Sequence, residues 1–147
     1  MIQETNEDIF SNIKKDQEYI EESRADMKFS ILDFKDYLLK LGELKQKWSE
    51  YLYNEQRYRD TIDEKMKEKY KELYSYYMYK QSDEKVDRKD VDIFIHGDKE
   101  YIKLVHWYNK FNNRCALVER ILKNVEGQSY IAHCLLKFSM WQSGANT

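Results

Sequence analysis

The sequence lacks proline and contains only four glycines among its 147 residues. Both residues interrupt helices, proline because it has no backbone N–H group and glycine because helix formation costs it more conformational freedom. Frequent turns are therefore excluded. The composition predicts a mainly α fold in which long helices form a single domain over residues 1–147.

Other absences exclude several classes of function. No apolar run approaches the roughly 18 residues of a membrane span, and no secretory signal begins the chain, so we expect no membrane partner. The two cysteines, Cys115 and Cys134, are widely separated and are expected to be buried thiols in a reducing compartment. The three histidines have no metal-binding spacing, and no phosphate-binding glycine motif occurs. We therefore expect no enzyme, no metal and no cofactor.

The charge is small overall but unevenly distributed. The formal net charge is −2. Residues 1–26 carry three basic and eight acidic side chains, whereas residues 101–147 carry six basic and two acidic ones. This asymmetry is typical of an acidic arm and a basic body, although the two ends could also neutralise each other within one fold. We expect residues 1–26 to form an acidic helix.

Residues 98–125 contain the clearest repeat in the sequence. Apolar side chains follow one another at alternating steps of four and three, which is the heptad pattern of a helix that faces a partner along one stripe. The stripe consists of Leu104, Tyr108, Phe111, Cys115, Val118, Leu122 and Val125. Asp98 is expected to cap this helix at its start.

Residues 98–147 are predicted to form a C-terminal helical hairpin used for oligomerisation. Gly127 is expected to end the first helix, Ser129 to cap the second and Gly144 to end it. Ile131, Cys134, Leu135, Phe138 and Trp141 share one face of the second helix. The side chains that we expect at the interface between copies are Leu104, Tyr108, Phe111, Val118, Leu122, Phe138 and Trp141.

Residues 27–79 show a second, weaker heptad register and predict one long interrupted helix or two stacked helices. Its polar positions are Lys45, Glu55, Arg59 and Lys69. Gly42 marks a possible bend. Residues 80–97 form a polar connector, in which Val91–Ile95 fits either a short helix or a strand.

Residues 57–80 combine cations with tyrosines. Single-stranded nucleic acid is bound by cations along its phosphates and by aromatic rings against its bases. The candidate DNA-binding residues are Arg57, Arg59, Lys67, Lys69, Lys71, Tyr70, Tyr74, Tyr76 and Tyr77. The alternative is a solvated helix with local ion pairs, such as Glu64–Lys67 or Glu68–Lys71.

Three segments resemble the UvsY family of phage recombination, repair and single-stranded-DNA-binding proteins. They are KYKELYSYY (residues 69–77), DRKDVDIFIHGDKEYIK (residues 87–103) and GQSYIAHCLLKFSMWQSG (residues 127–144). Lys71 matches the first basic position that this family places before its paired tyrosines. Leu73 falls on the second basic position, unless the alignment slips so that the pair is Lys69 and Lys71.

The resemblance implies a recombination mediator in the cytoplasm of an infected bacterial host. Such proteins form a homo-oligomeric ring, a hexamer or a heptamer, and bind single-stranded DNA. They weaken the hold of the phage single-strand-binding protein and help a RecA-type recombinase to load. The rival interpretation is a coiled-coil scaffold that binds proteins but no DNA, which the two heptad registers and the slightly negative net charge favour.

Overall fold

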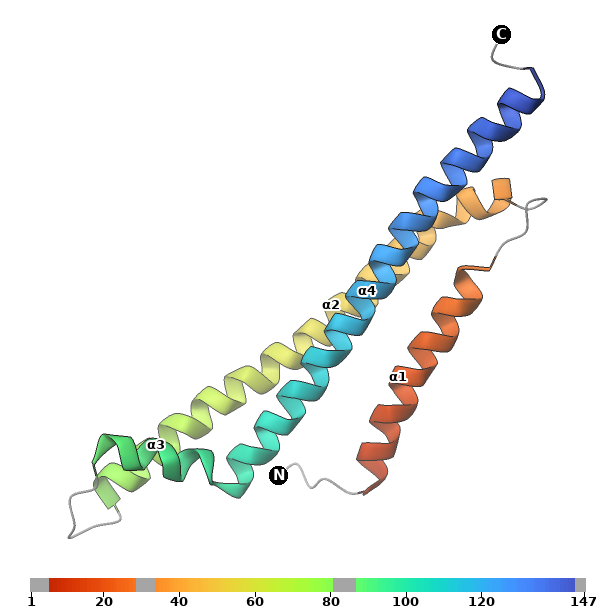
Figure 1. Cartoon of the computed structure of the whole chain (residues 1–147). Helices are drawn as coiled ribbons and strands as arrows, with labels where there is room; N and C mark the ends of the chain where they lie inside the picture. Colours follow the sequence, from red (N-terminus) through yellow and green to blue (C-terminus); the bar gives the residue numbers. More distant parts are fainter. Residues whose placement is uncertain (1–5, 29–33, 81–86, 145–147) are drawn as a thin grey trace. The chain divides into compact units, whose positions relative to one another are not determined.

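A computed structural model describes residues 6–28, 34–80 and 87–144, with the side chains of residues 15–28, 35–79 and 87–144 (Figure 1). Every regular element in these ranges is a helix, which confirms the mainly α prediction. The elements are α1 (Asn6–Asp26), α2 (Phe34–Ser75), the π-helix η1 (Tyr76–Lys80), α3 (Arg88–His96) and α4 (Lys99–Gln142). The helices α2 and α4 are 42 and 44 residues long.

The chain divides into two compact units. Unit 1 comprises residues 1–52 and 116–147, and unit 2 comprises residues 53–115. The helices α2 and α4 contribute residues to both units, whereas α1 belongs to unit 1, and η1 and α3 belong to unit 2.

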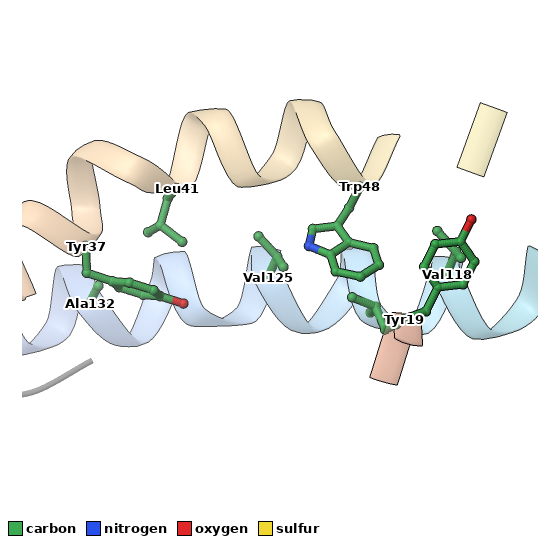
Figure 2. Close-up of a cluster of buried hydrophobic side chains, with 8 residues drawn as sticks. Tyr19, Tyr37, Leu41, Trp48, Val118, Val125 and Ala132 are labelled. Atoms are coloured by element: carbon green, nitrogen blue, oxygen red, sulfur yellow. The ribbon is translucent and has the colours of Figure 1, made fainter. Parts of the chain in front are cut away.

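The core of unit 1 combines side chains from three helices. Trp48 of α2 and Val118, Val125 and Ala132 of α4 are fully buried (Figure 2). Tyr19 of α1 meets the Trp48 ring edge-on, with ring centroids 6.0 Å apart. A buried ring of this size contributes strongly, since truncating a core tryptophan to alanine costs roughly 3–5 kcal/mol. The α4 heptad stripe therefore packs against α2 and α1 of its own chain in this unit.

Gly127 does not end a helix, so the predicted C-terminal hairpin is wrong. The helix α4 runs without a break from Lys99 to Gln142, and Ser129 lies inside it rather than at its start. A glycine costs a helix interior about 1 kcal/mol. Burial of Val125 and Ala132 on either side of Gly127 outweighs that cost, because both side chains are placed in the core by a continuous helix. Gly42 likewise lies inside α2.

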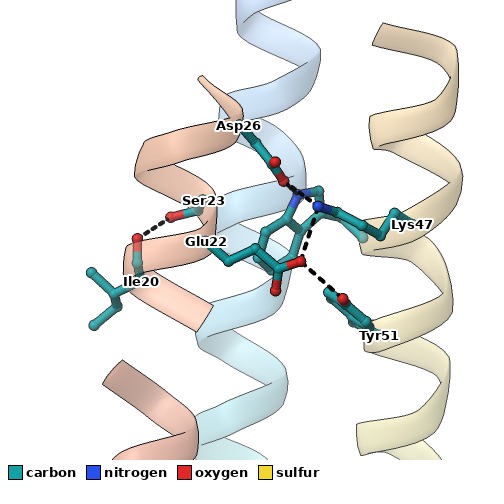
Figure 3. A network of polar contacts seen from close by, with 7 residues as sticks. Ile20, Glu22, Ser23, Asp26, Lys47 and Tyr51 are labelled. Atoms are coloured by element: carbon teal, nitrogen blue, oxygen red, sulfur yellow. Dashed lines mark hydrogen bonds and ion pairs between the residues drawn. The ribbon is translucent and has the colours of Figure 1, made fainter. Parts of the chain in front are cut away.

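A cluster of polar contacts fixes α1 to α2 within unit 1 (Figure 3). The Lys47 ammonium lies 2.5 Å from Asp26 and 3.0 Å from Glu22. Trp48 Nε1 donates to Asp26, and the Tyr51 hydroxyl donates to Glu22, both at 3.0 Å. Burial lowers the pKa of Lys47, but its bonds to the two carboxylates outweigh burial and raise the pKa. We call these five residues the α1 clasp.

The core of unit 2 settles the conformation of Val91–Ile95, which is helical. Val91 and Ile95 are both fully buried and lie four residues apart on one face of α3, where they pack with Leu73 and Tyr101. Asp98 caps α4 as predicted, since its Oδ1 accepts a hydrogen bond from the Tyr101 N–H at 3.0 Å. The predicted connector, residues 80–97, therefore contains a helix that supplies half of this core.

A buried charge pair joins α2 to α4 within unit 2. The carboxylate of Glu55 is fully buried, and Arg114 Nη1 lies 3.7 Å from it. Glu55 occupies a polar position of the weaker heptad register, and the sequence did not predict that its charge would be buried. Removing one partner of such a pair leaves an uncompensated buried charge, which usually costs about 3–5 kcal/mol.

The two cysteines differ from the expectation in one respect. Cys115 is buried as predicted, but Cys134 is exposed. Its neighbour Ala132 takes the buried position in α4 instead. Gly144 follows the helix with a φ of +74°, and its N–H donates to the Trp141 carbonyl, so the predicted end of this helix is confirmed.

Candidate nucleic-acid interface

Several of the predicted DNA-binding cations already contact carboxylates in unit 2. Lys69 Nζ lies 2.6 Å from Glu100 Oε2 and 3.6 Å from Glu72 Oε1, and its side chain is only 19% exposed. The hydrogen bond between Lys69 and Glu100 raises the pKa of the lysine and lowers the pKa of the glutamate. Lys69 therefore links α2 to the start of α4 and is a poor candidate for phosphate binding.

The other cations of α2 lie nearer the surface. Lys67 pairs with Asp63 at 2.9 Å, rather than with Glu64, and the Arg59 Nε pairs with Asp60 at 3.2 Å. The Arg57 guanidinium lies over the Tyr53 ring, 5.8 Å from its centroid.

Lys71 is exposed on α2. An exposed ion pair contributes little stability, so the Lys67 ammonium can exchange its carboxylate partner for a phosphate at small cost.

Two aromatic rings of η1 and one of α3 form a partly exposed aromatic surface. The Tyr76 and Tyr77 rings meet edge-on with centroids 5.3 Å apart, and Tyr77 stacks on Phe94 at 5.5 Å with an interplanar angle of 25°. Tyr76 is 44% exposed and Phe94 is 50% exposed. We call Tyr76, Tyr77 and Phe94 the aromatic platform. Such exposed ring faces are the feature that stacks on unpaired bases.

Two local structures position the platform. The π-helix η1 widens the last turn after Ser75, and π-turns are found mostly as short insertions that redirect side chains. The helix α3 buries Val91 and Ile95 and so leaves Phe94 on its exposed side.

The sequence interpretation does not include Phe94 in the site. The spacing of Val91 and Ile95 is the available signal, because it assigns one buried face to a helix and places Phe94, three residues after Val91, at the edge of that face.

Tyr70 and Tyr74 lie on α2 beside the core of unit 2. Their rings stack with centroids 6.4 Å apart, and both pack against the core of unit 2. The Tyr70 hydroxyl donates to Asp92 at 2.9 Å. The structure therefore leaves only Tyr76 of these four predicted tyrosines exposed, whereas Tyr70, Tyr74 and Tyr77 are half-buried against the core of unit 2.

The residues predicted for the oligomer interface are also divided. Val118 is fully buried inside unit 1, and Leu122 packs against that core, so their side chains already have partners in their own chain. Phe111 stacks on Tyr58 at 5.6 Å. Leu104 and Tyr108 are half-buried. The assignment of Val118 to an interface between copies is therefore wrong, because no surface of it remains.

Most of the exposed large apolar side chains of α4 lie near its carboxyl end, although Ile102 near its start is also exposed. Phe138 is 53% exposed, Trp141 is 69% exposed, and their rings contact each other with centroids 6.1 Å apart. Other large apolar side chains are exposed on the same stretch. We define the α4 apolar end as Tyr130, Ile131, Phe138, Met140 and Trp141. Contiguous exposed apolar surface often marks an interaction site, and Phe138 and Trp141 form such a contiguous pair.

The described ranges hold no group of three His, Cys, Asp or Glu side chains placed to bind one metal ion. No helix in those ranges has an apolar stretch long enough to cross a membrane. Comparisons with protein-family models, curated proteins and solved structures return no match for this chain.

Proposed function

We propose that this chain binds single-stranded DNA and acts as a recombination mediator, helping a RecA-type recombinase to replace a single-strand-binding protein. The observation that carries the proposal is the aromatic platform, in which exposed rings from η1 and α3 stand next to one another. The resemblance of three segments to the UvsY family supports the mediator role. The aromatic rings of the platform and the nearby lysines are side chains suited to binding bases and phosphates.

Ring stacking, rather than charge alone, would provide most of the affinity. Lys69 is already held by Glu100, and Lys67 and Arg59 are paired with neighbouring carboxylates. This leaves a modest positive field around the rings. A stacked base contributes roughly 1–3 kcal/mol whatever its identity, so binding of this type is independent of sequence, as a mediator requires.

The first experiment removes one platform ring. We expect Phe94→Ala to weaken binding of a thymidine oligonucleotide by about 1–3 kcal/mol, because it removes the ring that supports Tyr77. Ile93→Ala is the matched control, since Ile93 is an exposed apolar side chain of the same helix without a ring. Fluorescence anisotropy measures both. Equal affinities in the two variants would contradict a stacking platform.

The second experiment removes one exposed cation. Removing a lysine that binds one phosphate should reduce the slope of log affinity against log salt by about 0.7 for a single strand. We therefore expect Lys71→Ala to lower the slope by that amount. Lys65→Ala is the control, because Lys65 is exposed on a different face of α2. A slope that Lys71→Ala leaves unchanged would exclude this lysine from phosphate binding.

The scaffold alternative has one specific observation in its favour. The pairing of Lys67, Lys69 and Arg59 with carboxylates is what a helix without a polyanionic ligand would have. Titration of the wild-type chain with single-stranded oligonucleotide, at low and at moderate salt, separates the two functions. Absence of binding at low salt would favour the scaffold.

A further inference from the structure

A small pocket in unit 2 lies apart from the aromatic platform. It has a volume of about 290 Å³ and is lined by side chains from α2 and α4. The lining residues are Asp63, Met66, Lys67, Tyr70 and Tyr101. The four residues from α2 follow the spacing of one helix face.

The pocket has two aromatic walls. The Tyr70 and Tyr101 rings have centroids 6.2 Å apart and planes inclined by 59°. Tyr101 is buried, and Tyr70 also stacks on Tyr74, so neither ring is free to swing away. Met66 adds a flexible apolar surface between α2 and these rings, which suits a flat ligand of variable shape.

Polar groups of α3 hold both aromatic walls in place. Asp92 accepts a hydrogen bond from the Tyr70 hydroxyl at 2.9 Å. The His96 ring meets the Tyr101 ring edge-on at 5.5 Å, and His96 Nδ1 lies 2.8 Å from the Asp92 carbonyl oxygen. The two tyrosines are thus positioned by one short helix, which makes the pocket a preformed site rather than a gap between side chains.

The pocket also carries a cation on its rim. Lys67 is 75% exposed, and its ammonium lies 2.9 Å from Asp63. A phosphate approaching the rim can compete with Asp63 for this ammonium, because exposed ion pairs are weak. A ring-binding interior and an exposed cation together match a nucleotide, whose base is flat and whose phosphate is anionic.

We infer that this pocket accepts one unpaired base of a bound DNA strand, with Lys67 on the adjacent phosphate. The inference rests on the proposed function and adds to it a defined base subsite. The volume lies at the lower end of the roughly 300–1,000 Å³ typical of small-ligand pockets, which suits one base and excludes a duplex. Tyr70 and Tyr77 are seven residues apart, or about 10 Å along the helix, so one strand can reach both the pocket and the platform.

The test uses a thymidine oligonucleotide that carries one 2-aminopurine, whose fluorescence is quenched when it stacks on a ring. The wild-type chain should quench it. Tyr70→Leu keeps an apolar side chain but removes the ring, and we expect it to lose most of the quenching and roughly fivefold to 150-fold in affinity. The free 2-aminopurine nucleotide should bind far more weakly than the oligonucleotide. Equal affinity would overturn the inference in favour of a free-nucleotide site.

A second variant keeps the inference testable if Tyr70→Leu fails to fold. Asp63→Asn removes the competitor of the phosphate at an exposed position, so we expect affinity to rise roughly twofold to fivefold. Glu68→Gln is the control, because it removes one exposed carboxylate of α2 outside the pocket.

The outcomes distinguish failure of the base-subsite inference from failure of the proposed function. Suppose that the wild-type chain binds the oligonucleotide, that Tyr70→Leu keeps full quenching, and that Asp63→Asn has the affinity of its control. The pocket is then not a base subsite, and the proposed function stands. If the wild-type chain does not bind the oligonucleotide, both are wrong.

Discussion

Gly127 occupies an open position within α4. A side-chain methyl group added to it would meet no atom within 4 Å, and the same is true of Gly42 in α2. Neither glycine adopts the left-handed conformation that would require it, whereas Gly144 does. The two interior glycines therefore weaken their helices without a steric reason to be there.

We predict that Gly127→Ala stabilises the chain by about 0.5–1 kcal/mol. Alanine fits the space and loses less conformational freedom on folding. The midpoint of urea unfolding measures the change. Gly144→Ala is the opposing control, because its positive φ strains any side chain, and it should be neutral or destabilising. A destabilised Gly127→Ala would mean that α4 is not continuous there.

Individual helices are held by a few specific contacts. The helix α1 has a weak apolar stripe but ends beside the α1 clasp, where Lys47 contacts both Glu22 and Asp26. Its one large buried ring among the described side chains is Tyr19. Short amphipathic helices with a small buried face depend on such tertiary contacts for most of their stability.

We predict that Lys47→Met loosens α1 without unfolding α2. The substitution leaves two carboxylates next to one another and removes their shared cation. Amide hydrogen exchange of residues 15–26 should become faster, while exchange in residues 53–75 should be unchanged. Lys45→Met is the matched control, since Lys45 is exposed on the same helix. Unchanged exchange in α1 would show that Tyr19 and the remaining hydrogen bonds of the α1 clasp, from Trp48 and Tyr51, hold the helix without Lys47.

The link between Lys69 of α2 and Glu100 of α4 predicts a pH dependence of stability. The hydrogen bond from Lys69 lowers the folded-state pKa of Glu100 below its ordinary value of 4.5. The folded state therefore binds fewer protons there than the unfolded state. The stabilisation is complete above pH 4.5 and is lost as the pH falls through the lowered pKa.

We expect Glu100→Gln to remove this dependence. The difference in unfolding free energy between wild type and variant should be constant at neutral pH and should shrink below about pH 4.5. Glu119→Gln, at an exposed position of the same helix, provides the control. A difference that persists unchanged into acid would indicate that Lys69 does not stabilise the ionised glutamate.

For the whole molecule, heptad spacing predicted buried positions well but not their partners. Val118 and Val125 of the first stripe are buried, and so are Leu41 and Trp48, which occupy apolar positions of the heptad register in residues 27–79. A period of 3.5 residues reports only that a stripe is covered, and a second helix of the same chain covers it as well as a second copy does.

Other features depend on contacts that sequence spacing does not report. Lys69 meets Glu100 from another helix, and Phe94 meets Tyr77 across the segment between α2 and α3. The helix end predicted at Gly127 is wrong because local propensity is weaker than the burial of its neighbours. The sequence and the structure therefore both direct attention to the end of α2 as the candidate site, but the sequence overestimates the available cations and omits the α3 ring.

Self-association remains a proposal, and its expected location is now the α4 apolar end. We predict that Phe138→Ser combined with Trp141→Ser lowers the mass measured by analytical ultracentrifugation. Both side chains are exposed, so helix content by circular dichroism should not change. Leu39→Ser is the control, because Leu39 is 80% exposed on α2. A monomeric wild-type chain at micromolar concentration would contradict this proposal.

The π-helix η1 has a consequence for tolerance to deletions. A π-turn contains about one residue more than an α-helical turn. Losing one residue near Ser75 would let the segment wind as an ordinary α-helix and would change the direction of the η1 side chains by up to about 100°. Tyr77 would then turn away from Phe94, although every tyrosine would still be present. A one-residue deletion here should therefore weaken oligonucleotide binding as much as loss of a platform ring does.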